Sequence, residues 1–249
     1  MELKNTIALV TGGTKGIGAA TAIALAKAGA DVAVNGRHED AEGHEVLTQI
    51  RNTGQRGELI LADCADPQGC LHAVEETVKR LGGLHTLVHS AGGLVSGGLF
   101  EVTPEAWTRA FDIHVHAAFH LSRAAVPHMR KAQGGAIILI SSSAGKLALP
   151  TNIAYQVVKG SLPHFTRALA REMAPDNIRV NCVAPGVIRT RFHDAMTPAQ
   201  KTLNLEHRIP LRREGTTDQV ASLILQLVTN DYITGDTVTI DGGLTMRIA

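Results

Sequence analysis

Short apolar runs alternate with longer amphipathic stretches along the chain. Apolar and β-branched runs predict strands at residues 6–10, 31–35, 57–61, 84–89, 136–140, 178–183 and 237–240. Apolar residues at helical spacing predict helices at residues 16–28, 40–53, 67–81, 104–131, 154–173 and 217–228. Alternation of this kind is typical of a parallel sheet with helices on both faces. The pattern therefore predicts an α/β fold, doubly wound, with a seven-stranded parallel sheet.

No linker, repeat or charged block interrupts the alternation. We therefore expect a single domain over residues 1–249. The longest stretch without a pattern spans residues 186–214, between the last two predicted strands. Long loops of this kind in compact domains are usually lids or binding loops, so we expect a substrate lid there.

Composition narrows the class of protein. The chain has 249 residues, 44% of them apolar and 19% charged, and a net charge of +1. This balance indicates a globular protein and argues against a nucleic-acid binder, which normally has a basic face. No run approaches the roughly 18 apolar residues of a membrane span, and the N-terminus lacks the layout of a secretory signal. We expect a cytoplasmic protein that binds neither membranes nor nucleic acid.

Cysteines and histidines do not form a recognisable metal motif. The three cysteines, Cys64, Cys70 and Cys182, lack CxxC spacing and are expected to be reduced. His116 and His120 share a helix face, but no acidic or cysteine ligand accompanies them at a known motif distance. We predict no metal site.

A glycine-rich turn follows the first predicted strand and leads into an alanine-rich helix. Glycines in such a turn let the backbone approach a pyrophosphate closely, and the helix N-terminus offers free N–H groups to the phosphates. At this place in an alternating α/β chain, the turn predicts dinucleotide binding. The residues concerned are Gly12, Thr14, Lys15, Gly16, Ile17 and Gly18.

A second candidate site lies further along the chain. Tyr155 and Lys159 are one helical turn apart and share a helix face, and Ser142 precedes them by a short stretch. An ammonium beside the phenol would lower the pKa of Tyr155 from about 10 and let the phenol exchange a proton near neutral pH. The same spacing also occurs by chance on exposed helices, so the glycine turn upstream is what favours a functional interpretation.

Taken together, these motifs resemble those of the short-chain dehydrogenase/reductases. The resemblance covers the whole chain and rests on the glycine turn, Ala91-Gly92 after the fourth strand, the Ser142, Tyr155 and Lys159 set, and Pro185-Gly186 followed by Thr190. It implies a Rossmann-type sheet, a nicotinamide cofactor, hydride transfer between a ketone and a secondary alcohol, and a homotetramer. Apolar helices at residues 111–129 and 153–169 are compatible with a shared helix interface.

The resemblance also implies roles for individual residues. Tyr155 would be the acid in reduction and the base in oxidation, Lys159 would lower its pKa and hold the nicotinamide ribose, and Ser142 would bind the substrate oxygen. Ala91 and Gly92 would line the cofactor site. Residues expected to hold the carboxamide segment of the cofactor are Pro185, Gly186, Ile188 and Thr190.

The chain departs from the family pattern in two motifs. The family usually has Asn-Asn-Ala-Gly where this chain has His89-Ser90-Ala91-Gly92, and an asparagine where this chain has His114. In the family that second asparagine holds a water in a proton relay to the lysine. We include His114 as a candidate catalytic residue; the alternative is a core histidine that bonds the backbone at a helix bend.

The end of the second strand bears on cofactor preference. Family enzymes that use NAD carry an acidic residue there, whereas this chain has Asn35-Gly36-Arg37. Arg37, with Lys15 in the glycine turn, would suit a 2′-phosphate. We therefore expect NADP(H) to be preferred, with NAD(H) as the alternative. Asp63 resembles the family's adenine-contacting aspartate.

Substrate identity rests on weaker signals. Leu94, Val95, Leu147 and Leu149 are candidate pocket residues, and core packing is their alternative interpretation. Residues 189–213 contain six Lys/Arg and only two acidic residues, Asp194 and Glu206, and this excess of positive charge would attract an anionic substrate or an acidic carrier protein. The alternative interpretation is a lid whose charges are simply solvated. The closest subgroup in pattern is the 3-oxoacyl-[acyl-carrier-protein] reductases. Sugar, polyol and other secondary-alcohol dehydrogenases share the same motifs, and a non-catalytic dinucleotide-sensing protein is an alternative from another class.

Overall fold

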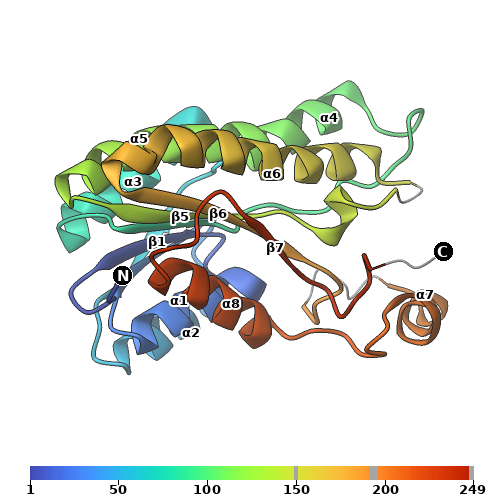
Figure 1. The fold of residues 1–249 in the computed structure, drawn as a ribbon, viewed down its shortest axis with the longest axis horizontal. Helices are drawn as coiled ribbons and strands as arrows, with labels where there is room; N and C mark the ends of the chain where they lie inside the picture. Colours follow the sequence, from blue (N-terminus) through green and yellow to red (C-terminus); the bar gives the residue numbers. More distant parts are fainter. Residues whose placement is uncertain (149–150, 191–195, 247–249) are drawn as a thin grey trace.

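The computed structural model describes residues 1–148, 151–190 and 196–246, and Figure 1 shows their fold. Seven strands form a parallel sheet in the order β3-β2-β1-β4-β5-β6-β7, which confirms the predicted sheet. The strands are β1 (Ile7–Thr11), β2 (Asp31–Gly36), β3 (Gly57–Leu61), β4 (Thr86–His89), β5 (Gly135–Ile140), β6 (Ile178–Pro185) and β7 (Thr237–Ile240).

Helices cover both faces of the sheet (Figure 1). One face is covered by α1 (Gly16–Lys27), α2 (Ala41–Arg51) and α8 (Thr217–Thr229). The other face is covered by α3 (Pro67–Leu81), α5 (Ala117–Lys131) and α6 (Ile153–Met173). Each face has its own buried apolar cluster, because the central strands are buried on both sides. None of the described helices is long and apolar enough to cross a membrane.

The helix predicted over residues 104–131 is interrupted. The structure divides it into α4 (Pro104–Phe111), the π-helical turn η1 (Asp112–His116) and α5. Within η1 the carbonyl oxygen of Ile113 accepts a hydrogen bond from Nε2 of His89, at 3.1 Å. Such a turn widens the helix and frees carbonyl groups for partners outside it. Residue periodicity does not reveal it, because its partner lies 24 residues earlier in the chain.

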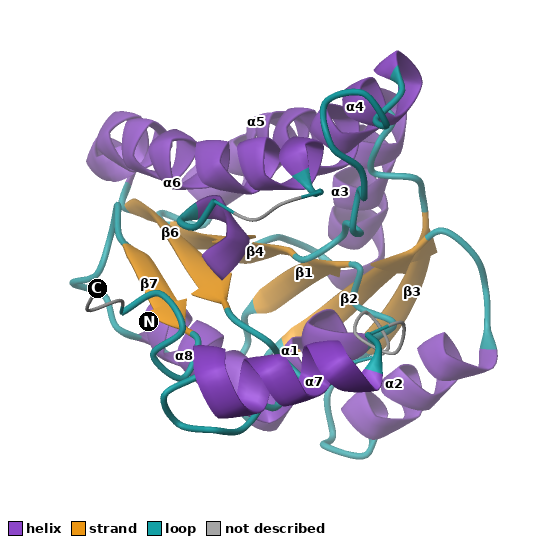
Figure 2. Ribbon diagram, turned by 90° about the vertical axis from the view of Figure 1, so that its right-hand side faces the viewer, coloured by secondary structure: helices purple, strands orange, loops and turns teal. Residues whose placement is uncertain are grey.

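Residues 186–214, expected to lack a pattern, contain a short helix and a π-helical turn. These are α7 (Pro198–Leu203) and η5 (Asn204–Arg208), and in Figure 1 α7 lies to one side of the two helix layers. Figure 2 shows the same helix from its exposed side. Thr197 and Gln200 form a capping box at the start of α7, with Pro198 in its first turn. That Thr-Pro-x-Gln signal was present in the sequence and was missed. Arg191 and Asp194 lie outside the described residues.

The sheet topology places the candidate residues together. Between β1 and β4 the strand order reverses, and open α/β sheets bind ligands beside the carboxyl ends of strands at such a point. The glycine turn follows β1, Arg37 follows β2, Asp63 follows β3, and Ala91 follows β4. Because all strands are parallel, these residues meet at one edge of the sheet.

Short 3₁₀ turns complete the connections near this edge. Ser142 begins η2 (Ser143–Gly145), directly after β5, and η3 (Ala174–Asp176) follows α6. Gly145 lies against the backbone of α6, where a Cβ on Gly145 would come within 2.7 Å of the carbonyl carbon of Lys159. Ser142 is thereby held beside the helix that carries Tyr155 and Lys159.

Candidate active site

The glycine turn is closely packed around its own backbone. A Cβ on Gly18 would lie 2.2 Å from the carbonyl oxygen of Gly12, so only glycine lets α1 approach the turn this closely. A Cβ on Gly12 would lie 2.8 Å from the backbone of Ala91, at the end of β4. The structure therefore brings the predicted residues of the turn and of the Ala91 loop together.

The N-terminus of α1 is open to an anion. Its N-cap residue, Lys15, makes no side-chain cap, and the first turn contains no acidic residue. By contrast, Asp40, Thr103 and Thr216 cap α2, α4 and α8 through their side chains. The first N–H groups of an uncapped helix attract phosphate. The turn and this helix end therefore fit the pyrophosphate of a dinucleotide.

Two cations predicted to sit at the adenosine end lie in different environments. Nζ of Lys15 is 2.8 Å from Oδ2 of Asp40 and 2.8 Å from Oε2 of Glu42. Arg37 is exposed at the end of β2 and has no salt bridge within residues 1–148, 151–190 and 196–246. Thr14 turns its methyl group toward Gly36 and Gly43, at the end of β2 and the start of α2.

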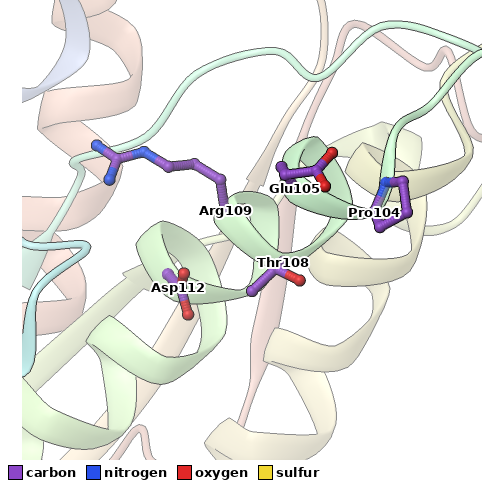
Figure 3. A pocket seen from close by; sticks show the side chains of 5 residues that line it. All are labelled: Pro104, Glu105, Thr108, Arg109 and Asp112. Atoms are coloured by element: carbon purple, nitrogen blue, oxygen red, sulfur yellow. The ribbon is translucent and has the colours of Figure 1, made fainter.

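Asp63, the candidate adenine contact, is bonded to a helix residue that the sequence did not suggest. Its Oδ2 lies 2.7 Å from Nη2 of Arg109 on α4, and its Oδ1 accepts the backbone N–H of Ala65. Desolvation opposes the effect, yet the hydrogen bonds from Arg109 and Ala65 and the charge of Arg37 hold the pKa of Asp63 below its ordinary value. Figure 3 shows Arg109 among the residues that line a shallow hollow on α4 and the turn that follows it. No predicted catalytic residue lines that hollow.

The segment after β6 reaches the glycine turn. Gly186 packs so tightly on Asp241 that a Cβ would lie 2.6 Å from the Asp241 Cβ. The methyl carbon of Thr190 would be 3.6 Å from a Cβ on Gly16. Ile188 is buried and pairs with Gly215 in an isolated parallel bridge. The predicted carboxamide residues thus lie beside the predicted phosphate residues.

Ser142 and Tyr155 are in hydrogen-bond contact. Ser142 has an extended backbone and caps η2, with its Oγ accepting the N–H of Ala144 at 3.1 Å. Its hydroxyl hydrogen-bonds the Tyr155 side chain and in doing so favours the phenolate. The serine oxygen is therefore fixed on one side and directed at the phenol on the other.

Lys159 is buried beneath Tyr155, with 6% of its surface exposed. Its Nζ donates a hydrogen bond of 2.8 Å to the carbonyl oxygen of Ile140 and lies 5.6 Å from the centroid of the Tyr155 ring. Burial lowers the pKa of Lys159 to about 8. The backbone of Lys159 is also held, because Ser141 Oγ donates to its carbonyl oxygen at 2.6 Å.

The predicted lowering of the pKa of Tyr155 by Lys159 is wrong for this structure. Burial raises the pKa of Tyr155, and the hydrogen bond from Ser142 opposes the rise without reversing it. The Lys159 ammonium faces the Tyr155 ring and donates its hydrogen bond to the Ile140 carbonyl. The sequence spacing was right about proximity but could not give the direction of the lysine side chain.

His114 joins this group from η1. Its ring meets that of Tyr155 edge-on, with centroids 5.9 Å apart, and its Nε2 lies 3.0 Å from the carbonyl oxygen of Gly93. Burial lowers the pKa of His114 to about 2. The ring is therefore neutral, and because a carbonyl accepts only, Nε2 carries the proton. This is the backbone bond at a helix bend that the alternative interpretation required.

A second buried histidine, which sequence reasoning noted only as a departure, ties three elements together. His89 Nδ1 lies 2.8 Å from Oγ1 of Thr11, and Nε2 donates to the Ile113 carbonyl. The Ala91 N–H donates in turn to Thr11 Oγ1, at 3.3 Å. Burial lowers the pKa of His89 to about 4. The sequence did contain a sign of this network, because His89 stands at a strand end where the family has an asparagine.

The remaining sequence predictions have mixed outcomes. Val95 packs in a small apolar cluster with Ala154 and Val158, as its alternative interpretation required, whereas Leu94 is exposed. Leu149 lies outside the described residues. The three cysteines are free and buried. No cluster of three or more potential metal ligands occurs among the described residues.

Comparisons with known proteins agree with this geometry. A family model described as enoyl-(acyl carrier protein) reductase matches residues 12–245. Dehydrogenase/reductase SDR family member 4 of Pongo abelii is 37% identical over 251 residues, covering 99% of this chain and 90% of that protein. The Rossmann-like sheet and these matches define an NAD(P)-dependent dehydrogenase or reductase. The chain belongs to the short-chain dehydrogenase/reductase family.

Solved structures of relatives are closely similar. A short-chain dehydrogenase from Burkholderia cenocepacia in complex with NADP has a TM-score of 0.92 at 33% identity, with 98% of this chain and 99% of that chain covered. L-Sorbose reductase from Gluconobacter frateurii, in complex with NADPH and L-sorbose, has a TM-score of 0.92 at 30% identity, with 100% and 99% covered. This chain is accordingly an enzyme, and the non-catalytic sensor alternative is not supported.

Proposed function

We propose that this enzyme reduces a 3-oxoacyl thioester to the 3-hydroxyacyl thioester and prefers NADPH as the reductant. The observation that carries the ketone and alcohol chemistry is the contact of Ser142 with Tyr155 above the buried Lys159. The fold and the family support nicotinamide chemistry at this edge of the sheet. The thioester and the NADP(H) preference are inferred from this chain's charged side chains together with the family pattern, and the roles of individual residues are inferred from the family resemblance.

A nicotinamide bound at this site would supply the hydride chemistry at the carbonyl carbon of the substrate. Tyr155 gives its proton to the developing alkoxide, and its raised pKa keeps it protonated at neutral pH. Ser142 donates its hydroxyl hydrogen bond to the substrate oxygen once that oxygen takes the place of the phenol as acceptor. Lys159, with a pKa of about 8, exchanges protons near neutrality and can restore the proton that Tyr155 loses.

His114 acts in this scheme as a positioning residue. It cannot supply a proton as an imidazolium near neutral pH, because its pKa is about 2. Its Nε2–H holds the Gly93 carbonyl, and its ring packs against Tyr155. We infer that the imidazole takes over the structural part of the family's asparagine and fixes both the loop and the phenol.

The residues at the edge of the sheet fit a nicotinamide dinucleotide. The turn around Gly16 and the open end of α1 would hold the pyrophosphate, Asp63 the adenine, and Arg37 a 2′-phosphate. Residues 185–190 would hold the nicotinamide end. Arg37 supports NADP(H) because it is exposed and has no salt bridge among the described residues, whereas Lys15, although also exposed, is paired with two carboxylates.

The thioester substrate is supported by the charge of the proposed lid, residues 186–214. Arg189 is paired with Glu214, at 3.3 Å, and so contributes little net charge. Lys201, Arg208 and Arg212 have no carboxylate within salt-bridge distance in the described part of the chain. Positive charge around a substrate entrance would attract an acidic carrier protein that delivers the acyl group.

A sugar or polyol substrate is the second candidate. It is favoured by the similarity to L-sorbose reductase, which was solved with NADPH and L-sorbose. Two of the candidate apolar pocket residues give no support to an apolar substrate pocket, since Val95 packs in an apolar cluster and Leu94 is exposed.

Oxidation of NADPH, followed by absorbance with a panel of ketones, tests the proposal. A 3-oxoacyl thioester, L-sorbose and a simple aliphatic ketone are compared at equal concentration. We expect the thioester to give the highest kcat/KM, and a carrier-protein-linked thioester to exceed the free one at low ionic strength. A higher kcat/KM for L-sorbose would replace the thioester proposal with the second candidate.

A homotetramer is proposed on the same family basis. Phe119 on α5 and Val157 on α6 expose 47% and 42% of their surfaces, and the two helices lie side by side in Figures 1 and 2. An exposed apolar face on neighbouring helices supports a shared helix interface. Light scattering at micromolar concentration is expected to give the tetramer mass, and a monomer mass would contradict it.

A further inference from the structure

Lys15 is held between two carboxylates at the adenosine end of the cofactor site. Asp40 and Glu42, in the first turn of α2, each place an oxygen 2.8 Å from its Nζ. Lys15 leaves 52% of its side-chain surface exposed, and the carboxylates leave about one third exposed. The three side chains together carry one net negative charge.

This cluster is fixed by the backbone that surrounds it. A Cβ on Gly36 would lie 2.9 Å from the methyl carbon of Thr14, and a Cβ on Gly43 would lie 3.2 Å from the same carbon. The glycine turn and the start of α2 are therefore in contact. Asp40 is also the N-cap of α2, and its Oδ1 accepts the Gly43 N–H at 2.8 Å. A helix N-terminus further stabilises carboxylates in its first turn.

We propose that Asp40 and Glu42 limit the selectivity of this enzyme for NADP(H) by withholding Lys15 from the 2′-phosphate. The inference rests on the proposed cofactor site and names the residues that tune it. A 2′-phosphate approaching Arg37 meets two like charges, and Lys15 can assist only by leaving two partners. The hydrogen bonds to Asp40 and Glu42 also raise the pKa of Lys15, so the lysine stays charged while it is held.

The consequence is a modest rather than a strict preference. Arg37 alone favours NADP(H), whereas the net charge of the Lys15 cluster favours the cofactor without the phosphate. NADH, which has ribose hydroxyls there, does not meet this repulsion. The enzyme is therefore expected to bind NADH as well. Its preference is set by the balance between the attraction of Arg37 for the 2′-phosphate and the repulsion from Asp40 and Glu42.

The double variant Asp40→Asn, Glu42→Gln tests this. Asparagine caps a helix about as well as aspartate, and glutamine is about as good a helix former as glutamate, so charge changes while structure is kept. Calorimetry compares 2′,5′-ADP, which carries the 2′-phosphate, with 5′-AMP, which lacks it, on the whole chain at low ionic strength. We expect 2′,5′-ADP to bind about three- to ten-fold more tightly in the double variant, with 5′-AMP changed by less than about two-fold.

Adding Lys15→Met to the double variant identifies the residue responsible. The gain for 2′,5′-ADP should then disappear, and it should shrink at high salt in the double variant itself. An equal gain for both nucleotides, or a gain that survives Lys15→Met, would overturn the inference. Equal binding of the two nucleotides by the unsubstituted chain would instead contradict the proposed NADP(H) preference. Even then, a preference for 2′,5′-ADP that emerges in the double variant would support the withholding of Lys15 by Asp40 and Glu42.

Discussion

The imidazole of His114 occupies the space that any side chain at position 92 would need. A Cβ on Gly92 would lie 2.1 Å from Cε1 of His114, and the backbone of Gly92 has a φ of +151°. The ring cannot move aside freely, because its Nε2 is bonded to the Gly93 carbonyl and its edge is packed on Tyr155. The loop after β4 and the catalytic helix are thus fitted to one another through a single side chain.

Replacing Gly92 by alanine should therefore impair catalysis. We expect Gly92→Ala to lower kcat at least about ten-fold and to destabilise the fold by about 1 to 3 kcal/mol, through overpacking and backbone strain. Gly93→Ala is the matched control, since nothing lies within 4 Å of a Cβ there. Steady-state kinetics and urea unfolding of both variants check the prediction. Similar losses in the two variants would show that the His114 contact is not the cause.

Tyr155→Phe should remove nearly all turnover and leave cofactor binding intact. The ring and its packing against His114 remain, and only the proton donor and the partner of Ser142 are lost. General acid catalysis is typically worth about 10² to 10⁴ in rate. Turnover is measured by NADPH absorbance and binding by the fluorescence of the bound cofactor. Residual activity within about ten-fold of the parent enzyme would rule out Tyr155 as the proton donor.

Much of this fold could be predicted because the signals are local. Alternating apolar runs and amphipathic helices depend on neighbours in sequence, and Gly18 is needed for a contact six residues away. The positions of Ser142, Tyr155 and Lys159 followed from motif spacing. The interruption of the long helix could not be predicted in this way. Within η1 the Ile113 carbonyl bonds His89, which lies at the end of β4 and far from η1 in the sequence.

The electrostatic details were also beyond the sequence. Lys15 looked like a free cation, yet it is paired with residues of α2, and Asp63 is paired with Arg109 on α4. Both partners come from segments that only the fold brings together. Burial likewise raises the pKa of Tyr155, against the expected lowering, and Lys159 donates its hydrogen bond to the Ile140 carbonyl. Whether each of these charged groups is available to a ligand therefore depends on its partners across the sheet edge and not on its residue type.

Arg37→Ala should weaken NADPH binding and leave NADH little affected. The loss is expected to be about 1 to 3 kcal/mol, as for a charge-assisted hydrogen bond to phosphate. Lys15 cannot compensate while Asp40 and Glu42 hold it. Fluorescence titration of both cofactors provides the measurement. Equal weakening of the two would assign Arg37 to adenine stacking or to folding, and the NADP(H) preference would lose its main support.

Stability should fall as the pH drops below about 6.5, because two buried histidines are kept neutral. Burial lowers the pKa of His89 from 6.5 to about 4 and that of His114 from 6.5 to about 2. Between the folded and the unfolded pKa of each histidine, the folded chain binds fewer protons than the unfolded chain, so the free energy of unfolding rises with pH. Each pKa unit corresponds to about 1.4 kcal/mol, which gives roughly 3 kcal/mol for His89 between pH 6.5 and 4.

The contribution of the two histidines to the pH dependence of stability can be separated from that of other titrating groups by substitution. His89→Asn and His114→Asn place the family's amide at each position, and an amide can still donate to the Ile113 or Gly93 carbonyl without a proton to gain. Urea midpoints between pH 5 and 7 should then vary less with pH than in the parent, with the pH dependence smallest in the double variant. An unchanged slope in both single variants would mean that other groups, such as the half-buried His85, account for the acid sensitivity.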